Sequence, residues 1–530
     1  MDNKLRIALV IQGETVPAWA AHLLQRMGEE GLAEIGLILR DAPVDPLTEL
    51  GVNSLLKWHL QLDRNRFGRS PDAFAPSPLP AAYQTVDVQA LEDYQGSPDE
   101  QLDALLWLSN RRPPAALCAH FPQGVWSYLH GEEELAHKEL LGYWEFVELQ
   151  EVIVSGLKIQ WKPSEEGRIL YRSWSVMPSL SITRALDAHF WKIQSFVLRA
   201  LRLLGTEGPA ALQKALAAAP LPKNGTAPAL RLPSVWQTGK HLTIHALRLA
   251  NKLWKKSNFN EQWLLLCHWT DGPSYEFGQF QKLLPPRDRF WADPFLWQRE
   301  GRTYLFLEEL PFQTEKGHLS VMEIFPDQPP GPVEVILDKD YHLSYPFLFE
   351  YEGDLYMIPE SYQANNIQLY LCTDFPTQWE FKMCLMDNLC AMDTTLFFHN
   401  DKWWLFTAIT ETEGSSHHDE LFLFYADTPL TDQWTPHPMN PIVSDVRSAR
   451  PAGNLYWENG QLIRPSQDCS RKYGYGFNLN VVEELSETTY RERVLRRVRP
   501  DWDASIRRTH SFNHLPGITV IDGLIQRWKH

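Results

Sequence analysis

The residues of this chain best suited to catalysis are carboxylates that stand at matching positions of a repeated sequence pattern. Asp293 lies near the start of "ADPFLWQREGRTYLFLEEL", in which an apolar run, an acidic-glycine turn and a second apolar run follow one another. The same plan recurs at intervals of 52, 48, 58 and 59 residues, starting at Tyr345, Asp393, Pro451 and His510. Short aromatic and β-branched strands at a period of about 50 residues are typical of propeller blades, whereas a β-sandwich lacks a long fixed period. We predict a five-bladed β-propeller over residues 271–530.

Equivalent positions of propeller blades converge on the central cavity, so the side chains at the repeat starts are expected to meet there. Glycoside chemistry needs one carboxylic acid to protonate a leaving oxygen and a second carboxylate to activate water or to attack. The expected catalytic carboxylates are Asp293, Asp393 and Glu360, the last at the far end of its hairpin. The expected substrate-binding residues are Tyr345, Arg450, Arg464, Gln467, Asp468 and His510.

Each of these side chains also has a structural interpretation. An Asp-Pro pair such as Asp293-Pro294 can cap a strand at a turn. The planar guanidinium groups of Arg450 and Arg464 suit a buried structural ion pair as well as a sugar or phosphate ligand. Glu308 and Glu309 are expected on a blade surface or paired with a nearby arginine.

The second half of the chain resembles known families. The segments "RFWADPFL", "YHLSYPFLFE", "ARPAG" and "RPSQDCS" resemble the N-terminal propeller of plant glucosamine inositolphosphorylceramide transferases and their bacterial relatives. The Ala-Asp-Pro opening also resembles five-bladed glycosidases such as arabinanases and β-xylosidases. This resemblance implies that Asp293 is a base or nucleophile, that Asp393 tunes it, and that Glu360 is the acid. The second blade departs from the pattern, with Tyr345 where an Asp might stand.

These residues lead to two functional hypotheses for the propeller. The first is a carbohydrate-active enzyme that transfers or hydrolyses at a glycosidic bond in bacterial surface-glycan or glycolipid biosynthesis. Its substrate would be a carbohydrate or a nucleotide sugar. The second is a non-catalytic glycan-binding or scaffold module that partners a glycosyltransferase.

The first part of the chain alternates strands with helices. We predict strands at 4–11 and 33–40, a helix at 16–29 and a helical stretch near 99–110. This alternation indicates an α/β domain with a mainly parallel sheet, placed at residues 1–205. No glycine-rich phosphate-binding motif follows the first strand, so no nucleotide cofactor is expected.

Two segments of this domain resemble folate-dependent formyltransferases, namely "LRIALVIQGETVPAWAAHLL" and "GVWSYLHGEE". Those enzymes carry an Asn-x-His pair and a downstream Asp, and the matching positions here hold Ser127, Leu129 and Glu165. Leucine cannot move a proton. His130 is one residue out of register, which on a strand would turn it to the opposite face. We expect a Rossmann-type formyltransferase fold that has lost formyl transfer; sugar N-formylation would need His130 to replace the missing histidine.

Residues 206–270 are expected to form a linker with an amphipathic helix. The segment 236–256 is basic and can either pack between domains or lie on an anionic membrane as a peripheral contact. A net charge of −16 disfavours nucleic-acid binding, and six cysteines without ligand spacing indicate no metal site. The N-terminus lacks the features of a signal peptide, so we expect a cytoplasmic protein.

Overall fold

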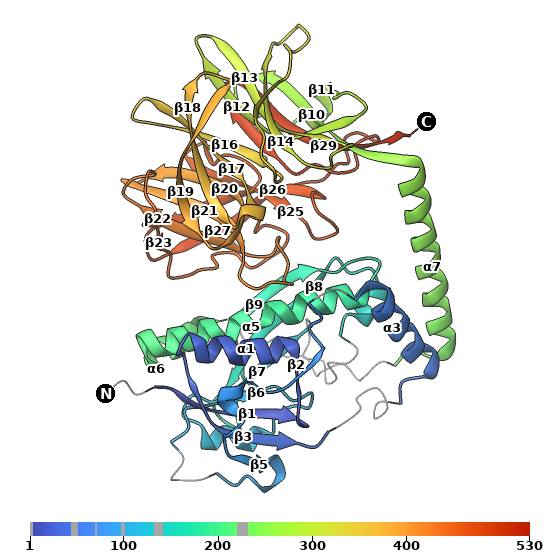
Figure 1. Cartoon of the computed structure of the whole chain (residues 1–530), viewed down its shortest axis with the longest axis vertical. Coiled ribbons are helices and arrows are strands. Elements are labelled where there is room, and N and C mark those ends of the chain that lie inside the picture. The colour runs from blue at the N-terminus through green and yellow to red at the C-terminus, as the bar shows by residue number, and fades with distance from the viewer. Residues whose placement is uncertain are drawn as a thin grey trace. The chain divides into compact units, whose positions relative to one another are not determined.

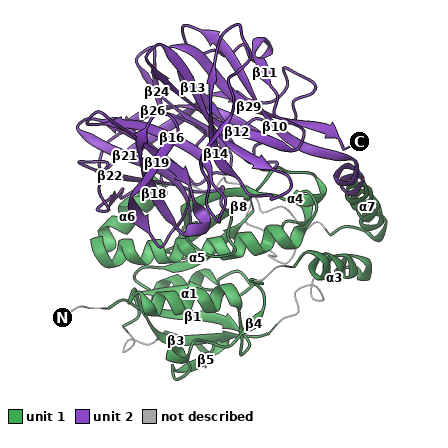
Figure 2. Ribbon diagram, turned by 45° about the horizontal axis from the view of Figure 1, so that its top comes forward, with its two compact units in different colours: residues 1–250, 411–416 green, residues 251–410, 417–530 purple. Residues whose placement is uncertain are grey.

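The chain divides into two compact units. The computed structural model describes residues 4–43, 51–68, 71–96, 101–131, 141–219 and 232–529. One unit contains residues 1–250 with 411–416, and the other contains residues 251–410 with 417–530 (Figure 2). Each unit buries its own apolar side chains.

Five antiparallel sheets of four strands each form the second unit, as predicted for a five-bladed propeller. The first sheet contains β12 (Arg289–Arg299), β13 (Arg302–Pro311), β14 (His318–Ile324) and β15 (Glu334–Leu337). The second contains β16 (Ser344–Tyr351), β17 (Asp354–Glu360), β18 (Asn366–Asp374) and β19 (Gln378–Asp387). The third contains β20 (Cys390–His399), β21 (Lys402–Thr410), β22 (Leu421–Ala426) and β23 (Thr435–Pro436). The fourth contains β24 (Tyr456–Glu458), β25 (Gln461–Asp468), β26 (Gly476–Leu485) and β27 (Tyr490–Val498).

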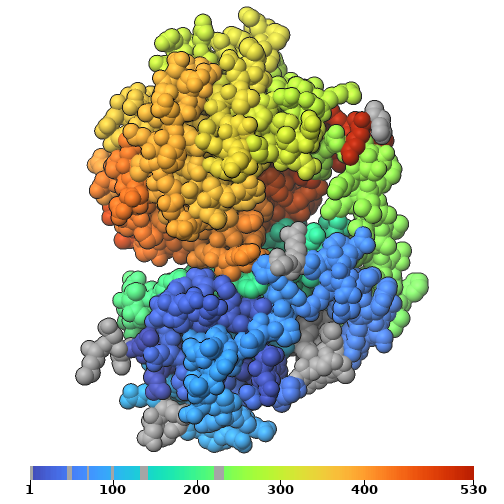
Figure 3. Space-filling view, viewed as in Figure 1, coloured from blue at the N-terminus to red at the C-terminus, as the bar shows by residue number. Residues whose placement is uncertain are grey.

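The fifth sheet joins the two ends of the propeller chain. In order across the sheet its strands are β11 (Gln281–Leu283), β10 (Phe259–Thr270), β29 (Gly517–Trp528) and β28 (Phe512–Leu515). β10 pairs with β29 along its whole length, from Phe259 opposite Trp528 to Thr270 opposite Gly517. In Figure 3 the red C-terminal residues accordingly lie beside the green residues that precede the first complete blade. Residues 259–270, which we expected in the linker, therefore belong to the propeller.

The first unit is built on a seven-stranded sheet (Figure 1). In order across the sheet its strands are β5 (Val88–Ala90), β3 (Glu34–Asp41), β1 (Arg6–Gln12), β6 (Ala104–Trp107), β7 (Val125–His130), β8 (Val152–Gln160) and β9 (Arg168–Val176). The pairings from β5 to β7 are parallel, and β8 and β9 are antiparallel. The helical stretch expected near 99–110 was wrong, because its four buried residues form the central strand β6. The likeness to formyltransferases stays a prediction.

Helices cover this sheet and lead to the propeller. α1 (Ala18–Glu29) and α5 (Ile182–Glu207) share one apolar core with the sheet, in which the Trp19 and Tyr128 rings meet edge to face at 5.6 Å. The other α-helices within the described ranges are α3 (Ser54–Phe67), α4 (Tyr143–Val147), α6 (Pro209–Ala218) and α7 (Val235–Asn258). In the part of the chain that is described, no helix has the length and apolar character needed to cross a membrane.

Candidate functional site

Three blades share one backbone feature at the predicted repeat position. In β12, β16 and β20 the pairing register shifts around a bulge, and the bulged residues are Asp293, Tyr345 and Asp393. Their φ angles are 49°, 47° and 53°, in the left-handed region that non-glycine residues seldom adopt. Such conformations persist only where the surroundings determine them, and they cluster at functional sites. The repeated bulge turns the three side chains into the interior, where all are at most 3% exposed.

Tyr345 ties neighbouring blades together at this level. Its backbone N–H donates to Asp293 Oδ2 at 3.3 Å. Its hydroxyl lies 2.8 Å from Thr395 Oγ1 and accepts a hydrogen bond from the Gly453 backbone N–H at 2.8 Å. The side chain is fully buried, so its contacts are those of a structural link and not of the substrate ligand that we predicted.

Arg450 brings two of the predicted carboxylates together. Its Nε donates to Asp393 Oδ2 at 2.5 Å, and its Nη2 donates to Glu360 Oε2 at 2.9 Å. Gln467 donates a further hydrogen bond to Asp393 Oδ2 at 2.7 Å. A third contact of the guanidinium runs from Nη1 to Nδ1 of His418 at 3.1 Å. Burial and the charge of Arg450 hold the pKa of His418 well below its ordinary value, so this imidazole is a neutral acceptor.

One guanidinium cannot neutralise two buried carboxylates, and Glu360 is the one that takes a proton. Burial and the negative charge of Asp393 raise the pKa of Glu360 well above its ordinary value, against the opposing effect of Arg450. A hydrogen bond between Glu360 and Asp393 raises it further. Like charges that share a site separate their pKa values in this way. The arrangement therefore supplies a carboxylic acid, Glu360, next to Arg450.

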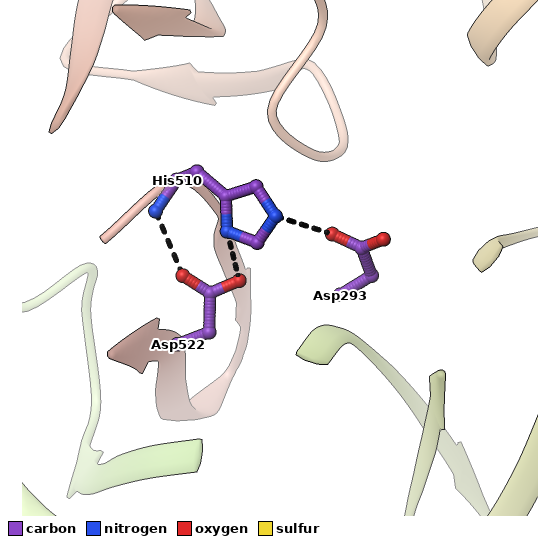
Figure 4. Close-up of side chains that lie close together, drawn as sticks. All are labelled: Asp293, His510 and Asp522. Atoms are coloured by element: carbon purple, nitrogen blue, oxygen red, sulfur yellow. Dashed lines mark hydrogen bonds and ion pairs between the residues drawn. The ribbon is translucent and has the colours of Figure 1, made fainter. Parts of the chain in front are cut away.

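A second group of side chains in the site is a histidine, His510, that lies between Asp293 and Asp522 (Figure 4). His510 Nδ1 lies 2.5 Å from Asp522 Oδ2, and His510 Nε2 lies 3.3 Å from Asp293 Oδ1. Asp522 also accepts the backbone N–H groups of His510 and Ser511, at 2.7 and 3.2 Å. Asp522 thereby fixes the imidazole with its other nitrogen toward Asp293, as an orienting carboxylate does in a catalytic triad.

The two groups that face each other have raised pKa values. Burial raises the pKa of Asp293 to about 8, although the positive charge of His510 lowers it. Burial lowers the pKa of His510, but Asp522 and Asp293 outweigh it and bring the value to about 9. The two residues therefore titrate as a pair in the mildly alkaline range.

Asp293, His510 and Asp522 also satisfy the spacing of a metal site, since their ligand atoms lie within 4.8 Å of one another. Two ligands of one ion at about 2.1 Å cannot normally approach each other as closely as His510 Nδ1 and Asp522 Oδ2 do, at 2.5 Å. In addition, each ring nitrogen already faces one carboxylate. We interpret the three residues as a proton-sharing chain.

A cavity of about 420 Å³ opens beside these groups within the propeller. Among the predicted site residues, Glu360, Arg450 and His510 line it. Asp293 and Asp393 do not line the cavity themselves. Asp293 contacts the lining residue His510, and Asp393 contacts the lining residue Arg450, which also binds Glu360. The remaining wall is rich in aromatic and titratable side chains, including Trp263, Phe290, Glu308, His342, Tyr362, His418 and Tyr473.

Other predicted binding residues have structural partners instead of facing the cavity. Arg464 donates to both carboxylate oxygens of Glu492 at 2.7 Å. Asp468 lies 2.5 Å from Arg499 and caps the backbone N–H of Ser470. For Arg464 this is the structural ion pair of the alternative interpretation.

Several functional side chains were missed from the sequence. Glu308 and Glu309, which we expected on a blade surface or paired with a nearby arginine, are buried, at 6% and 3% exposed. Glu309 pairs with Arg289, whereas Glu308 faces the cavity, 3.3 Å from Nε2 of His342. Asp522 was also missed, because nothing in the sequence around it, "VIDG", identifies His510 as its partner.

Three predicted residues of the degenerate formyltransferase site, Ser127, Leu129 and His130, lie on strand β7, and Glu165 lies outside it. Leu129 packs with Val154 and Ile169. Ser127 is buried two residues earlier on the same strand. His130 is buried, with Nδ1 2.9 Å from Nε2 of His189 on α5. Glu165 is on the surface and pairs with Lys162 at 2.7 Å. The "GEE" part of the segment that carried this resemblance extends outside the described residues.

Comparison with known proteins places the propeller beside a plant family. Residues 284–513 match the family model described as "Glucosamine inositolphosphorylceramide transferase 1, N-terminal". The plant transferases of this name from Oryza sativa subsp. japonica and Arabidopsis thaliana are 35% and 34% identical over 206 residues. That stretch is 38% of this chain but only 27% of the length of each plant protein. The resemblance of the propeller that was expected from the sequence is confirmed.

Solved structures with a similar trace are glycoside hydrolases. The family 117 glycoside hydrolase Zg3597 of Zobellia galactanivorans has a TM-score of 0.33 and 11% identity over 50% of this chain and 91% of its own. The GH62 α-L-arabinofuranosidase domain of Coprinopsis cinerea has a TM-score of 0.34 and 12% identity over 51% and 96%.

The pKa of Asp293 has a consequence for stability that can be measured. Because its folded value of about 8 lies above its ordinary value of 3.8, the folded chain holds more protons between these limits. This contribution to stability is complete below about pH 4 and is lost as the pH rises to about 8. Across this range, the free energy of unfolding of wild type minus that of Asp293→Asn should fall by up to about 1.4 kcal/mol per pH unit. Denaturant titrations of both proteins measure the difference, and parallel curves would contradict the assignment.

Proposed function

We propose that the propeller is a carbohydrate-active enzyme that acts at a glycosidic bond, with its reaction centre at the cavity beside Glu360 and His510. The observation that carries this proposal is that Glu360 and His510 line one cavity, with Asp293 3.3 Å behind the Nε2 atom of His510. Cleavage of a glycosidic bond requires two carboxyl groups whose different surroundings separate their pKa values.

Glu360 is the acid in this proposal. It faces the cavity and its pKa is raised well above the ordinary value, first by burial and then by Asp393. It can therefore protonate the leaving oxygen of a bound glycoside. Asp393 and Arg450 act as positioning residues, because both hold Glu360 and neither has to exchange a proton with the substrate.

Asp293 is the base or nucleophile, and His510 is the group that controls its charge. The imidazolium of His510 lowers the pKa of Asp293 against the effect of burial. Asp522 keeps the imidazole in place for this purpose. In its ionised form Asp293 is the group that accepts the proton of a water or of an acceptor hydroxyl, through the His510 that separates it from the cavity.

The lining of the cavity suits a sugar. The rings of Trp263 and Tyr473 both contact His510 in its wall, with ring centroids 4.3 and 5.1 Å from that of the imidazole. Binding sites for small organic ligands combine such apolar surfaces with few oriented polar groups. The plant relatives are named as transferases, which supports a role in glycolipid or surface-glycan biosynthesis with a glycan or nucleotide sugar as substrate.

A glycan-binding module is the second candidate. It is favoured by one observation, namely that Asp293 and Asp393 lie behind the cavity wall and are bonded to protein groups. The first domain is not proposed as a formyltransferase, because Leu129 packs in an apolar cluster where a proton carrier would be needed.

Single carboxyl-to-amide variants separate the two candidates. In a screen of aryl glycosides and nucleotide sugars, Asp293→Asn and Glu360→Gln should each lower turnover by about 10²–10⁴-fold while ligand still binds. Glu350→Gln, on the exposed end of β16, is the matched control and should behave as wild type. Glu308→Gln tests the other carboxyl group that faces the cavity. Glycan binding without turnover, equal in wild type and Asp293→Asn, would instead establish a binding module.

The pH profile tests the Asp293–His510 couple directly. Because Asp293 must lose its proton to act as a base, kcat/KM should rise through about pH 8 and not near the ordinary value of an aspartate. In His510→Asn the positive charge that lowers the pKa of Asp293 is gone, so this limb should move to higher pH. An acidic limb near pH 4 in wild type, or an unchanged limb in the variant, would exclude Asp293 as the base.

A further inference from the structure

Exposed apolar side chains are concentrated on two helices of the first half of the chain. Among the described residues, eighteen large apolar side chains are exposed, and seven of them belong to α3 and α7. These seven are Trp58, Leu62, Val235, Trp236, Leu247, Leu253 and Trp254. Single exposed apolar residues are normal on a protein surface, but a concentration of this kind marks an interaction site.

One face of α7 carries three of these side chains in a row. Trp236, Leu247 and Trp254 are separated by 11 and 7 residues, which places them within about 20° of one another around the helix. They are 81%, 65% and 53% exposed. The two tryptophans lie about 27 Å apart along the helix axis, at 1.5 Å per residue.

The opposite face of the N-terminal half of α7 is already occupied. Thr238 is fully buried, and His241 Nδ1 lies 2.8 Å from the hydroxyl of Tyr143. His245 Nδ1 lies 3.3 Å from Nε2 of His59 on α3. In this half of α7 the exposed apolar face therefore lies opposite side chains that are held by protein contacts. In the C-terminal half the ring of Trp254 meets Phe259 and Trp528 edge to face, at 5.7 and 6.3 Å.

A groove of about 900 Å³ runs along the N-terminal half of this exposed face. It is lined by Leu55 of α3 and by Trp236, Lys240, Thr243 and Ile244 of α7. Its surface is mainly apolar, and Lys240 supplies one cationic group.

The charge of α7 indicates which kind of partner binds its exposed face. The helix contains no aspartate or glutamate, in a chain whose net charge is −16. Its cationic residues are Lys240, Arg248, Lys252, Lys255 and Lys256. Within the described residues none of its four lysines makes an ion pair with a carboxylate.

We propose that α7 is a peripheral membrane-binding helix that lies on an anionic lipid surface. Trp236, Leu247 and Trp254 enter the interfacial layer of the bilayer, and the lysines contact the phosphate groups of the lipids. Amphipathic helices with large apolar residues on one side and lysines on the other bind membranes in this orientation. Each lysine near an anionic surface strengthens the attraction. The groove beside Lys240 receives part of a lipid molecule.

The composition of the face distinguishes a lipid surface from a protein partner. Lysine is depleted at the centre of protein–protein interfaces, whereas α7 has one lysine within its exposed row and three at its C-terminal end. Tryptophan at both ends of an apolar row, with flanking lysines, is the arrangement that places rings at the headgroup level.

Vesicle flotation of the full chain tests the proposal. The vesicles contain phosphatidylcholine alone, or phosphatidylcholine and phosphatidylglycerol in equal parts. Wild type should float only with the anionic vesicles, and less so at high salt. The double variant Trp236→Ser/Trp254→Ser and the triple variant Lys252→Gln/Lys255→Gln/Lys256→Gln should each lower the partition by more than about tenfold. Trp457→Ser removes a tryptophan of the propeller surface that is 56% exposed, and this control should float as wild type does.

Two results would overturn the proposal. One is wild type that fails to float with the anionic vesicles, or variants that float equally well. The other is a change of molecular mass in light scattering when Trp236 and Trp254 are replaced, without a change in flotation, which would assign the face to a second copy of the chain. Circular dichroism of each variant shows that it is folded, so that lost flotation reports the surface and not unfolding.

Discussion

A single guanidinium shared by two buried carboxyl groups is the interaction on which this site depends. Arg450 reaches Asp393 at 2.5 Å and Glu360 at 2.9 Å, and it can balance only one negative charge. Burial makes a second uncompensated charge costly, so the outer carboxyl group, Glu360, keeps a proton. The same cation also orients Glu360 toward the cavity. Because one cation faces two carboxyl groups, Glu360 can act as a proton donor. Removal of Arg450 would leave both Asp393 and Glu360 without a counterion.

The fold provides this geometry by repeating one backbone distortion. Bulges at Asp293, Tyr345 and Asp393 place three left-handed residues at equivalent positions of successive blades. Two of these positions carry carboxylates, and the third carries a tyrosine whose hydroxyl connects the blades. The strain is supported by the closed sheet system, since the pairing of β10 with β29 joins the ends of the propeller and holds His510 and Asp522 opposite Asp293.

The hairpins of the blades could be predicted because their signals are local. Turn pairs such as Glu300-Gly301 and Asn459-Gly460 separate apolar runs at a regular spacing, and the structure has hairpins at both places. β10 could not be found in this way, because its partner lies more than 240 residues away in the sequence. Two of the repeat positions, Asp293 and His510, lie 3.3 Å apart in the structure. Pairing between buried ions was not predictable, since Arg464 has the same chemistry whether it binds a substrate or Glu492.

The protonation state of Glu360 is the central claim, and infrared spectroscopy measures it directly. Difference spectra between wild type and Glu360→Gln at neutral pH isolate the absorption of this one carboxyl group. A protonated carboxyl band that disappears in the variant is the predicted result, because burial and Asp393 raise the pKa of Glu360 well above its ordinary value. A difference spectrum that contains only a lost carboxylate band at neutral pH would contradict the account, since Arg450 would then hold Glu360 as a permanent ion pair.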